Sequence, residues 1–166
     1  MKYLTFVLLL VALFSIEIQA QNDKTNEPKD RFSYSYGVLL GDNLKKMEFT
    51  MDMINMEKLI DGTTTYLKGA NPSVTQLAAQ QVINNLLNKI TENKTAKEQG
   101  KTVEPISKSS LEEFSYNYGV IIGVNLKNFG ATTADFSTKD FEAGYKALFT
   151  NKDLKITAED AQNEVT

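Results

Sequence analysis

Histidine, cysteine and tryptophan are all absent from the 166 residues of this chain. Without histidine and cysteine, the chain cannot form a Ser-His-Asp or Cys-His catalytic group, nor an imidazole or thiolate metal site. No disulfide can form either, which in an exported protein fits a bacterial periplasm or cell surface better than a small secreted animal domain. We therefore expect no catalytic residue, no cofactor and no metal.

An excess of charge of one sign is also missing, since 18 Lys and Arg stand against 21 Asp and Glu, for a net charge of −3. Nucleic-acid binding needs clustered basic side chains, so nucleic acid is not an expected partner. The segment from Gly37 to Gly41 lacks the Lys and the Ser or Thr that complete a phosphate loop. Adjacent carboxylates such as Glu112 and Glu113 point in different directions on a helix, which favours a solvated face over acid–base chemistry.

Only one long hydrophobic run occurs, at the N-terminus. Lys2 precedes the apolar segment 4–14, and Ile18-Gln19-Ala20 resembles a cleavage site. This pattern predicts a signal peptide over residues 1–20, with the mature chain exported to the periplasm or cell surface of a bacterium. An uncleaved membrane anchor is the alternative, but the run ends at Glu17 and is shorter than the roughly 20 residues that a bilayer span requires.

Polar linkers divide the remaining chain. Residues 21–30 are polar and predict a flexible tail, and residues 98–110 combine glycine, proline and charge. We call residues 31–97 the first repeat and residues 111–166 the second repeat, because FSYSYGVLLGDNLK at 32–45 returns 82 residues later as FSYNYGVIIGVNLK. Ten of these fourteen positions are identical, and the alignment continues without a gap.

Hydrophobic spacing predicts three helices in each repeat. The first pair covers about 31–47 and 113–129, and the second pair covers about 56–68 and 138–149, the latter with Ser137 as its N-cap. The third helix begins at Ser73 or Thr75 in the first repeat and at Thr157 in the second. The second repeat is truncated in this last helix, which predicts either docking on a partner or a fragment of a longer protein. The expected fold is all-α, with two tandem three-helix units whose first helices intertwine.

Two glycines recur four residues apart in each first helix. A glycine inside a helix costs about 1 kcal/mol relative to alanine, so a compensating interaction is required. Without Cβ atoms, another helix can approach closely and pack apolar groups into the groove, by analogy with membrane helices. The predicted helix-pairing residues are Phe32, Tyr36, Gly37, Leu40, Gly41, Leu44, Phe114, Tyr118, Gly119, Ile122, Gly123 and Leu126.

Three motifs together form a recognisable signature. Tyr-Gly-Val-(Leu/Ile)-(Leu/Ile)-Gly-x-Asn-Leu-Lys occurs in both repeats, followed in the second by Phe141-x-x-Gly144-x-x-x-Leu148 and by residues 156–161, ITAEDA. This combination resembles the N-terminal domain of FKBP-type peptidyl-prolyl isomerases, a family that includes the macrophage infectivity potentiator proteins and related periplasmic chaperones. The second repeat matches better, whereas the first matches well only over 32–45 and at Gly62.

The resemblance implies an all-helical module whose first helices intertwine to form a dimer and whose long third helix carries a C-terminal isomerase domain. In such proteins the module can also help to hold unfolded clients. The isomerase domain would be rich in strands and would contain an aromatic proline pocket, and the sequence through Thr166 contains neither. Peptidyl-prolyl isomerase activity is therefore implied for the family but not expected from these residues.

The favoured function is an exported, non-catalytic dimerisation and chaperone-like module involved in protein folding. Its expected partners are itself, as an intramolecular pseudo-dimer or a homodimer, and unfolded client proteins. The alternative is a fragment of a full-length peptidyl-prolyl isomerase whose catalytic domain lies beyond residue 166. A surface adhesin or small-molecule carrier is a third reading, which predicts a sizeable cavity between the helices.

Overall fold

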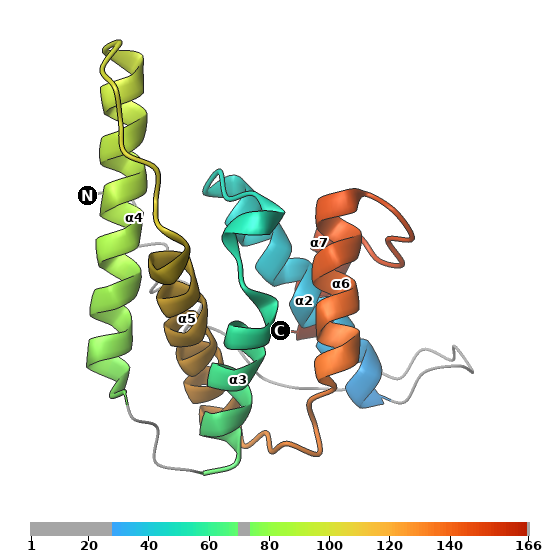
Figure 1. The fold of residues 1–166 in the computed structure, drawn as a ribbon. Helices are drawn as coiled ribbons and strands as arrows, with labels where there is room; N and C mark the ends of the chain where they lie inside the picture. Colours follow the sequence, from blue (N-terminus) through green and yellow to red (C-terminus); the bar gives the residue numbers. More distant parts are fainter. Residues whose placement is uncertain (1–27, 70–73, 166) are drawn as a thin grey trace. The chain divides into compact units, whose positions relative to one another are not determined.

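The computed structural model describes residues 28–69 and 74–165, and these ranges contain helices and no strand. The predicted signal peptide, most of the predicted tail and Ser73 lie outside the described residues. The elements, labelled in Figure 1, are α2 (Pro28–Lys46), η2 (Met51–Met53), α3 (Met56–Leu67), α4 (Gln76–Glu98), α5 (Lys108–Asn128), α6 (Thr138–Thr150) and α7 (Ala158–Val165). The all-α prediction is confirmed. Within the described ranges, every helix is too short or too polar to cross a bilayer.

Side-chain caps explain where four of these helices begin. Asn55, Thr75, Ser107 and Ser137 each have extended backbone and accept a hydrogen bond from the backbone N–H three residues ahead. Such caps satisfy one of the donors that a helix start leaves without a partner. Ser107 accounts for a difference from the sequence prediction, because it starts α5 at Lys108 rather than near residue 113. The predicted N-cap role of Ser137 agrees with the structure.

A sharp turn ends α4 and reverses the chain. Gly100 adopts a left-handed backbone with φ of 69°, and the N–H of Lys101 donates to the carbonyl oxygen of Ala96 at 2.9 Å. This is the usual way in which a glycine terminates a helix. The following extended segment returns along α4, where Asn93 Nδ2 donates to the carbonyl oxygen of Glu104 at 3.2 Å. Figure 1 shows this segment running beside α4 toward α5.

The described residues form two compact units that do not follow the order of the sequence. Unit 1 contains residues 28–51 and 134–165, and unit 2 contains residues 52–69 and 74–133. Helix α2 packs against α6 and α7 in unit 1, and α5 packs against α3 and α4 in unit 2. Each unit therefore takes its first helix from one repeat and its second and third helices from the other, an exchange that the tandem boundaries 31–97 and 111–166 did not predict.

Each unit has its own apolar core. The core of unit 1 gathers the buried residues Tyr34, Val38, Ala147 and Ala161, with partly buried Leu39, Leu148, Leu154, Ile156 and Ala158 against them. The core of unit 2 gathers buried Ala79, Val120 and Val124, with partly buried Tyr66, Val74, Tyr116 and Ile121 against them. Most of these positions correspond under the 82-residue shift, as Val38 does to Val120 and Ala161 to Ala79. The same packing solution is thus used in both units.

Candidate helix-pairing interface

Two glycines lie where α2 crosses α6 in unit 1. A Cβ atom added to Gly37 of α2 would lie 2.0 Å from the carbonyl oxygen of Phe141, and one added to Gly144 of α6 would lie 2.1 Å from that of Tyr34. Cβ atoms do not approach other atoms so closely, so only glycine fits at either position. The two helix backbones therefore touch directly at this crossing. This close approach is possible because neither glycine has a side chain.

The crossing of α5 with α3 in unit 2 repeats this geometry. A Cβ atom added to Gly119 of α5 would lie 2.0 Å from the carbonyl oxygen of Leu59, and one added to Gly62 of α3 would lie 2.2 Å from that of Tyr116. Each of these four positions is 82 residues from its counterpart in unit 1. The two crossings thus have the same register, with one glycine contributed by each helix.

The second glycine of each first helix faces the same neighbour one turn further on. A Cβ atom on Gly123 would lie 2.7 Å from the carbonyl oxygen of Thr63 and 2.7 Å from Cβ of Tyr66. A Cβ atom on Gly41 would meet the side chain of Leu148, with Cδ2 at 2.8 Å. The backbone contact therefore extends along α5, whereas the corresponding contact of α2 involves a flexible side chain.

All twelve predicted pairing residues lie within the described part of the chain. Phe32 and Tyr118 are half-buried. The others are buried: Tyr36, Gly37, Leu40, Gly41, Leu44, Phe114, Gly119, Ile122, Gly123 and Leu126. The structure brings the glycines of each first helix onto the second helix of the other repeat, a partner that the sequence analysis had not identified.

Aromatic rings extend the contact of α2 with α6. The Tyr36 ring lies between two others, with centroid distances of 5.9 Å to Phe32 and 6.2 Å to Phe141. Tilted pairs at these distances are favourable beyond the area that they bury. In unit 2, the corresponding rings of Phe114 and Tyr118 lie 5.5 Å apart. Each first helix therefore presents an aromatic pair beside its glycines.

A buried serine on each first helix fixes the start of the second helix that it contacts. Ser33 Oγ accepts a hydrogen bond of 2.8 Å from the backbone N–H of Ser137, and Ser115 Oγ accepts one of 2.9 Å from that of Asn55. Both serine side chains are fully buried. Because Ser137 and Asn55 are the N-caps of α6 and α3, these bonds join the two helices of a pair at a capping residue.

A lysine in the last turn of each first helix contacts the end of the same second helix. Lys45 Nζ donates to the carbonyl oxygen of Leu148 at 3.2 Å and lies 5.7 Å from the Phe149 ring centroid. In unit 2, Lys127 Nζ lies 5.5 Å from the Tyr66 ring centroid. A cation near a helix C-terminus and over an aromatic face is stabilising by about 0.5–1 kcal/mol when exposed.

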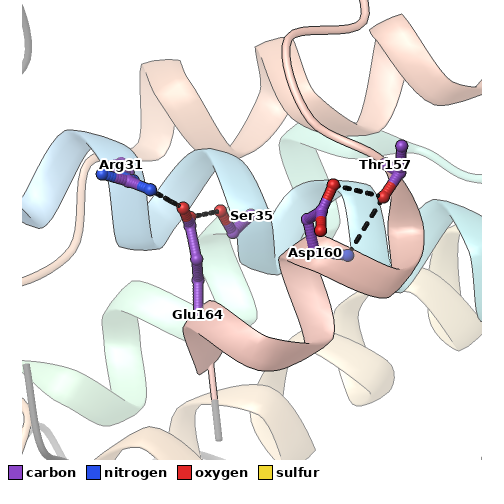
Figure 2. A network of polar contacts seen from close by, with 5 residues as sticks. All are labelled: Arg31, Ser35, Thr157, Asp160 and Glu164. Carbon is purple, nitrogen blue, oxygen red and sulfur yellow. Dashed lines mark hydrogen bonds and ion pairs between the residues drawn. The ribbon is translucent and has the colours of Figure 1, made fainter. Parts of the chain in front are cut away.

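A carboxylate of α7 forms a polar contact that occurs in unit 1 alone among the described residues. Glu164 accepts hydrogen bonds from Arg31 Nε at 2.6 Å and from Ser35 Oγ at 2.5 Å, and pairs with Arg31 Nη2 as well. Figure 2 shows Glu164 reaching from α7 to both side chains of α2, with Thr157 and Asp160 capping the start of α7 beside them. In unit 2, the position of Ser35 is taken by Asn117.

Two polar side chains of α5, those of buried Asn117 and half-buried Tyr118, are shielded at their polar groups. Asn117 is 3 % exposed, and its Nδ2 donates to the carbonyl oxygen of Glu113 at 2.7 Å, while Oδ1 has no hydrogen-bond partner among the described residues. Burial raises the pKa of Tyr118 to about 12, because the charged phenolate is less well solvated inside the protein. The neutral phenol of Tyr118 is therefore favoured over the phenolate in the folded chain.

Sequence reasoning overlooked several residues of the interface. Gly62 and Gly144 were aligned with each other but were not assigned to pairing, although glycine inside two equivalent helices was the signal. Ser33 and Ser115 are identical in the repeated segment, but a serine on an apolar face does not reveal which backbone it will contact. Glu164 carried no signal, because its partners lie at the other end of the sequence.

The described side chains supply packing surfaces and hydrogen bonds. They include no group of three or more acidic side chains that could hold a metal ion. A shallow polar groove lies between α4 and the segment that returns along it, lined by Asn85, Asn88, Lys89, Glu92 and Thr102 among others. The arrangement of the interface is suited to holding helices together.

Comparison with known proteins identifies a family model that matches part of the chain. Residues 29–107 match a family model described as the domain amino terminal to FKBP-type peptidyl-prolyl isomerase. The matched range spans α2, α3 and α4 and so includes the residues of both crossings that come from the first repeat. No curated protein and no solved structure shows significant similarity to the chain.

Proposed function

We propose a function that proceeds from one premise: residues 29–107 belong to the family of domains amino terminal to FKBP-type peptidyl-prolyl isomerases. On this chain the domain acts as an exported, non-catalytic pairing module with a chaperone-like role in protein folding. The module consists of two tandem copies, of which the second is residues 111–166. The two copies supply both halves of a helical pair from one chain.

The observation that carries the proposal is the repeated backbone contact. A Cβ atom added to Gly37 would lie 2.0 Å from the carbonyl oxygen of Phe141, and one added to Gly119 would lie 2.0 Å from that of Leu59. These two close backbone approaches are related by the 82-residue shift. A module that pairs with an identical copy would show two equal contacts of this kind, one in each direction. Here both directions occur within a single chain, which supports an intramolecular pseudo-dimer over a homodimer of two chains.

Solution mass tests the pairing directly. Light scattering on residues 21–166 should give the mass of a single chain, because both halves of each crossing are already present. Replacing Gly37 and Gly119 together by leucine should abolish cooperative thermal unfolding, since each side chain would overlap a backbone carbonyl. A dimeric mass would instead favour pairing between chains, and unchanged melting of the leucine variant would exclude the glycine contacts as the basis of pairing.

The chaperone-like role is tested with a non-native client. We expect residues 21–166 to slow the aggregation of a chemically unfolded protein when both are present in equal amounts, as measured by light scattering. An equal concentration of an unrelated helical protein with a similar net charge serves as the control. If residues 21–166 and the control protein gave the same aggregation curve, the chaperone-like role would be contradicted and the pairing role alone would remain.

A second candidate is a piece of a full-length isomerase, favoured because the matched family is defined by its place before an isomerase domain. Under that proposal the catalytic domain follows residue 166. Sequencing the coding DNA beyond that point for a continuing open frame tests it, and a refolding assay limited by proline isomerisation measures the activity of residues 21–166 alone. The non-catalytic proposal predicts no acceleration in that assay.

Export rests on the pattern of residues 1–20. Cleavage by a bacterial signal peptidase should leave a mature protein that begins at Gln21, with no membrane attachment. N-terminal sequencing of the protein recovered from the periplasm checks this. Recovery of an intact N-terminus in the membrane fraction would favour the uncleaved anchor.

A further inference from the structure

Glu164 and its two partners in unit 1 are each replaced by a different residue type at the corresponding position of unit 2. In unit 1, Glu164 of α7 contacts Arg31 and Ser35 of α2 (Figure 2). The residues 82 positions away are Val82 on α4 in place of Glu164, and Glu113 and Asn117 on α5 in place of the α2 residues. Most of the apolar core positions and the first glycine contact of each crossing correspond between the units, whereas this set differs in charge.

We propose that this set determines which third helix covers which first helix. The structure pairs α7 with α2 and α4 with α5, so that each third helix crosses to the first helix of the other repeat. The first helices share ten of fourteen residues over the repeated segment, and the third helices place the same residue type, Ala161 and Ala79, in the two cores. A charge difference is therefore needed to select the exchanged arrangement. This inference rests on the proposed function, in which the two copies pair within one chain.

The alternative pairing fails on electrostatic grounds. If α7 covered α5, the register that now places Glu164 beside Arg31 would place it beside Glu113, and two carboxylates would repel each other. Its contact with Ser35, a fully buried hydroxyl, would be replaced by one with the amide of Asn117. Because the Glu164 side chain is only 18 % exposed, solvent would screen this repulsion only in part.

The converse pairing loses the favourable interaction. If α4 covered α2, Val82 would take the place of Glu164, and its side chain cannot accept hydrogen bonds from Arg31 or Ser35. The carboxylate would be removed from a site where two donors now converge on it. Both incorrect pairings are therefore disfavoured, one by repulsion and one by loss of a charge-assisted contact, which is how specificity between similar partners is generally achieved.

Cysteine cross-links report which pairing forms, because the natural chain has no cysteine. Val38 and Ala161 share the core of unit 1, so Val38→Cys with Ala161→Cys reports the exchanged pairing. Ala79 occupies the position of Ala161 in the other third helix, so Val38→Cys with Ala79→Cys reports pairing within the first repeat. In the otherwise natural chain, at low protein concentration, the first pair should cross-link within one chain and the second should not.

The decisive variant exchanges the selecting residues of the third helices, Val82→Glu with Glu164→Val. We expect the cross-link between positions 38 and 161 to fall by about tenfold relative to that between positions 38 and 79, the change that about 1.4 kcal/mol of pairing free energy produces. We also expect a lower melting temperature. An unchanged cross-link ratio together with an unchanged melting temperature would overturn the proposal.

A rescue variant separates selection from general damage. Adding Arg31→Glu, Ser35→Asn, Glu113→Arg and Asn117→Ser moves the whole set to the other unit and should restore both the exchanged cross-link and the melting temperature. Failure of this rescue would show that the double variant merely destabilises the fold, and would also overturn the proposal. Failure of the proposed function is distinct, because it would appear in the otherwise natural chain as cross-links between two chains.

Discussion

The backbone N–H of Ser137 donates a hydrogen bond of 2.8 Å to Ser33 Oγ, across a sequence separation of more than one hundred residues. The hydroxyl in turn donates to the carbonyl oxygen of Lys29 at 2.7 Å, so it joins the first turns of α2 to the cap of α6. Ser115 has the same two contacts in unit 2, with Asn55 and Leu111. A fully buried hydroxyl that both accepts and donates in this way has a structural role.

Replacing Ser33 by alanine should lower the free energy of unfolding by about 1–3 kcal/mol, because the N–H of Ser137 would lose its acceptor in a buried site. Urea unfolding followed by circular dichroism measures the change. Ser109→Ala is the control, since its exposed hydroxyl shares a hydrogen bond with the hydroxyl of Ser107 and the expected change is within about 0.5 kcal/mol. Equal losses in the two variants would contradict the assigned role of Ser33.

Gly37→Ala should destabilise the protein although alanine favours helices by about 1 kcal/mol over glycine. The added Cβ would lie 2.0 Å from a backbone carbonyl oxygen, which cannot move without separating α2 from α6. We expect a net loss of about 1–3 kcal/mol in a urea titration. Gly41→Ala is the matched control, because its Cβ would meet the mobile end of Leu148, and it should be tolerated better. If Gly37→Ala were more stable than Gly41→Ala, the close approach of Gly37 to the backbone of α6 would be contradicted.

Asn117→Ala should leave stability unchanged or raise it by about 1 kcal/mol. The Oδ1 atom of this buried amide lacks a hydrogen-bond partner among the described residues, and desolvating such an atom is unfavourable. Alanine also has the higher helix propensity. Thermal unfolding monitored by circular dichroism checks the expectation. A marked loss of stability would indicate that Oδ1 binds a water molecule or another group that stabilises the fold.

High pH should destabilise the protein through Tyr118. Its pKa is raised to about 12 in the folded chain, whereas an unfolded tyrosine has a pKa of about 10. The folded state therefore holds this proton more tightly, and the stabilisation is complete below pH 10 and is lost as the pH rises from about 10 to 12. The free energy of unfolding should fall by up to about 1.4 kcal/mol per pH unit in this range.

Comparison with Tyr118→Phe isolates this contribution from other groups that titrate at high pH. The variant should show a shallower decline between about pH 10 and 12 when urea midpoints are measured at intervals. Parallel curves for the two proteins would mean that the phenol of Tyr118 is not buried from solvent in the folded state.

The sequence predicted the helices well because their signals are local. Apolar spacing and the caps at Ser137 and Thr75 lie within a few residues of the helices that they define, and the all-α fold follows from them. The early start of α5 was not predicted, because residues 108–112 have little apolar periodicity and the capping group of Ser107 was overlooked. The family match confirms the family to which the motifs pointed, and it covers residues 29–107, which include the first repeat, although the motifs had favoured the second.

The exchange of helices could not be predicted from the same pattern. The repeated segments 32–45 and 114–127 present almost the same surface, so periodicity alone cannot decide which second helix each will contact. The contact that we propose selects the third helix, Glu164 with Arg31, likewise joins residues that are far apart in the sequence. Long-range polar pairs of this kind leave no periodic signal in one sequence.

The division of unit 1 between distant parts of the chain has a consequence during synthesis. About 90 residues separate the end of α2 from the start of α6, and ribosomes add roughly 5–20 residues per second, so α2 waits on the order of 5–20 s before the helix it packs against has been made. During that interval its apolar surface has no native cover from α6. In a nascent chain, the native cover of α2 by α6 therefore becomes available only after residues 138–150 have been synthesised.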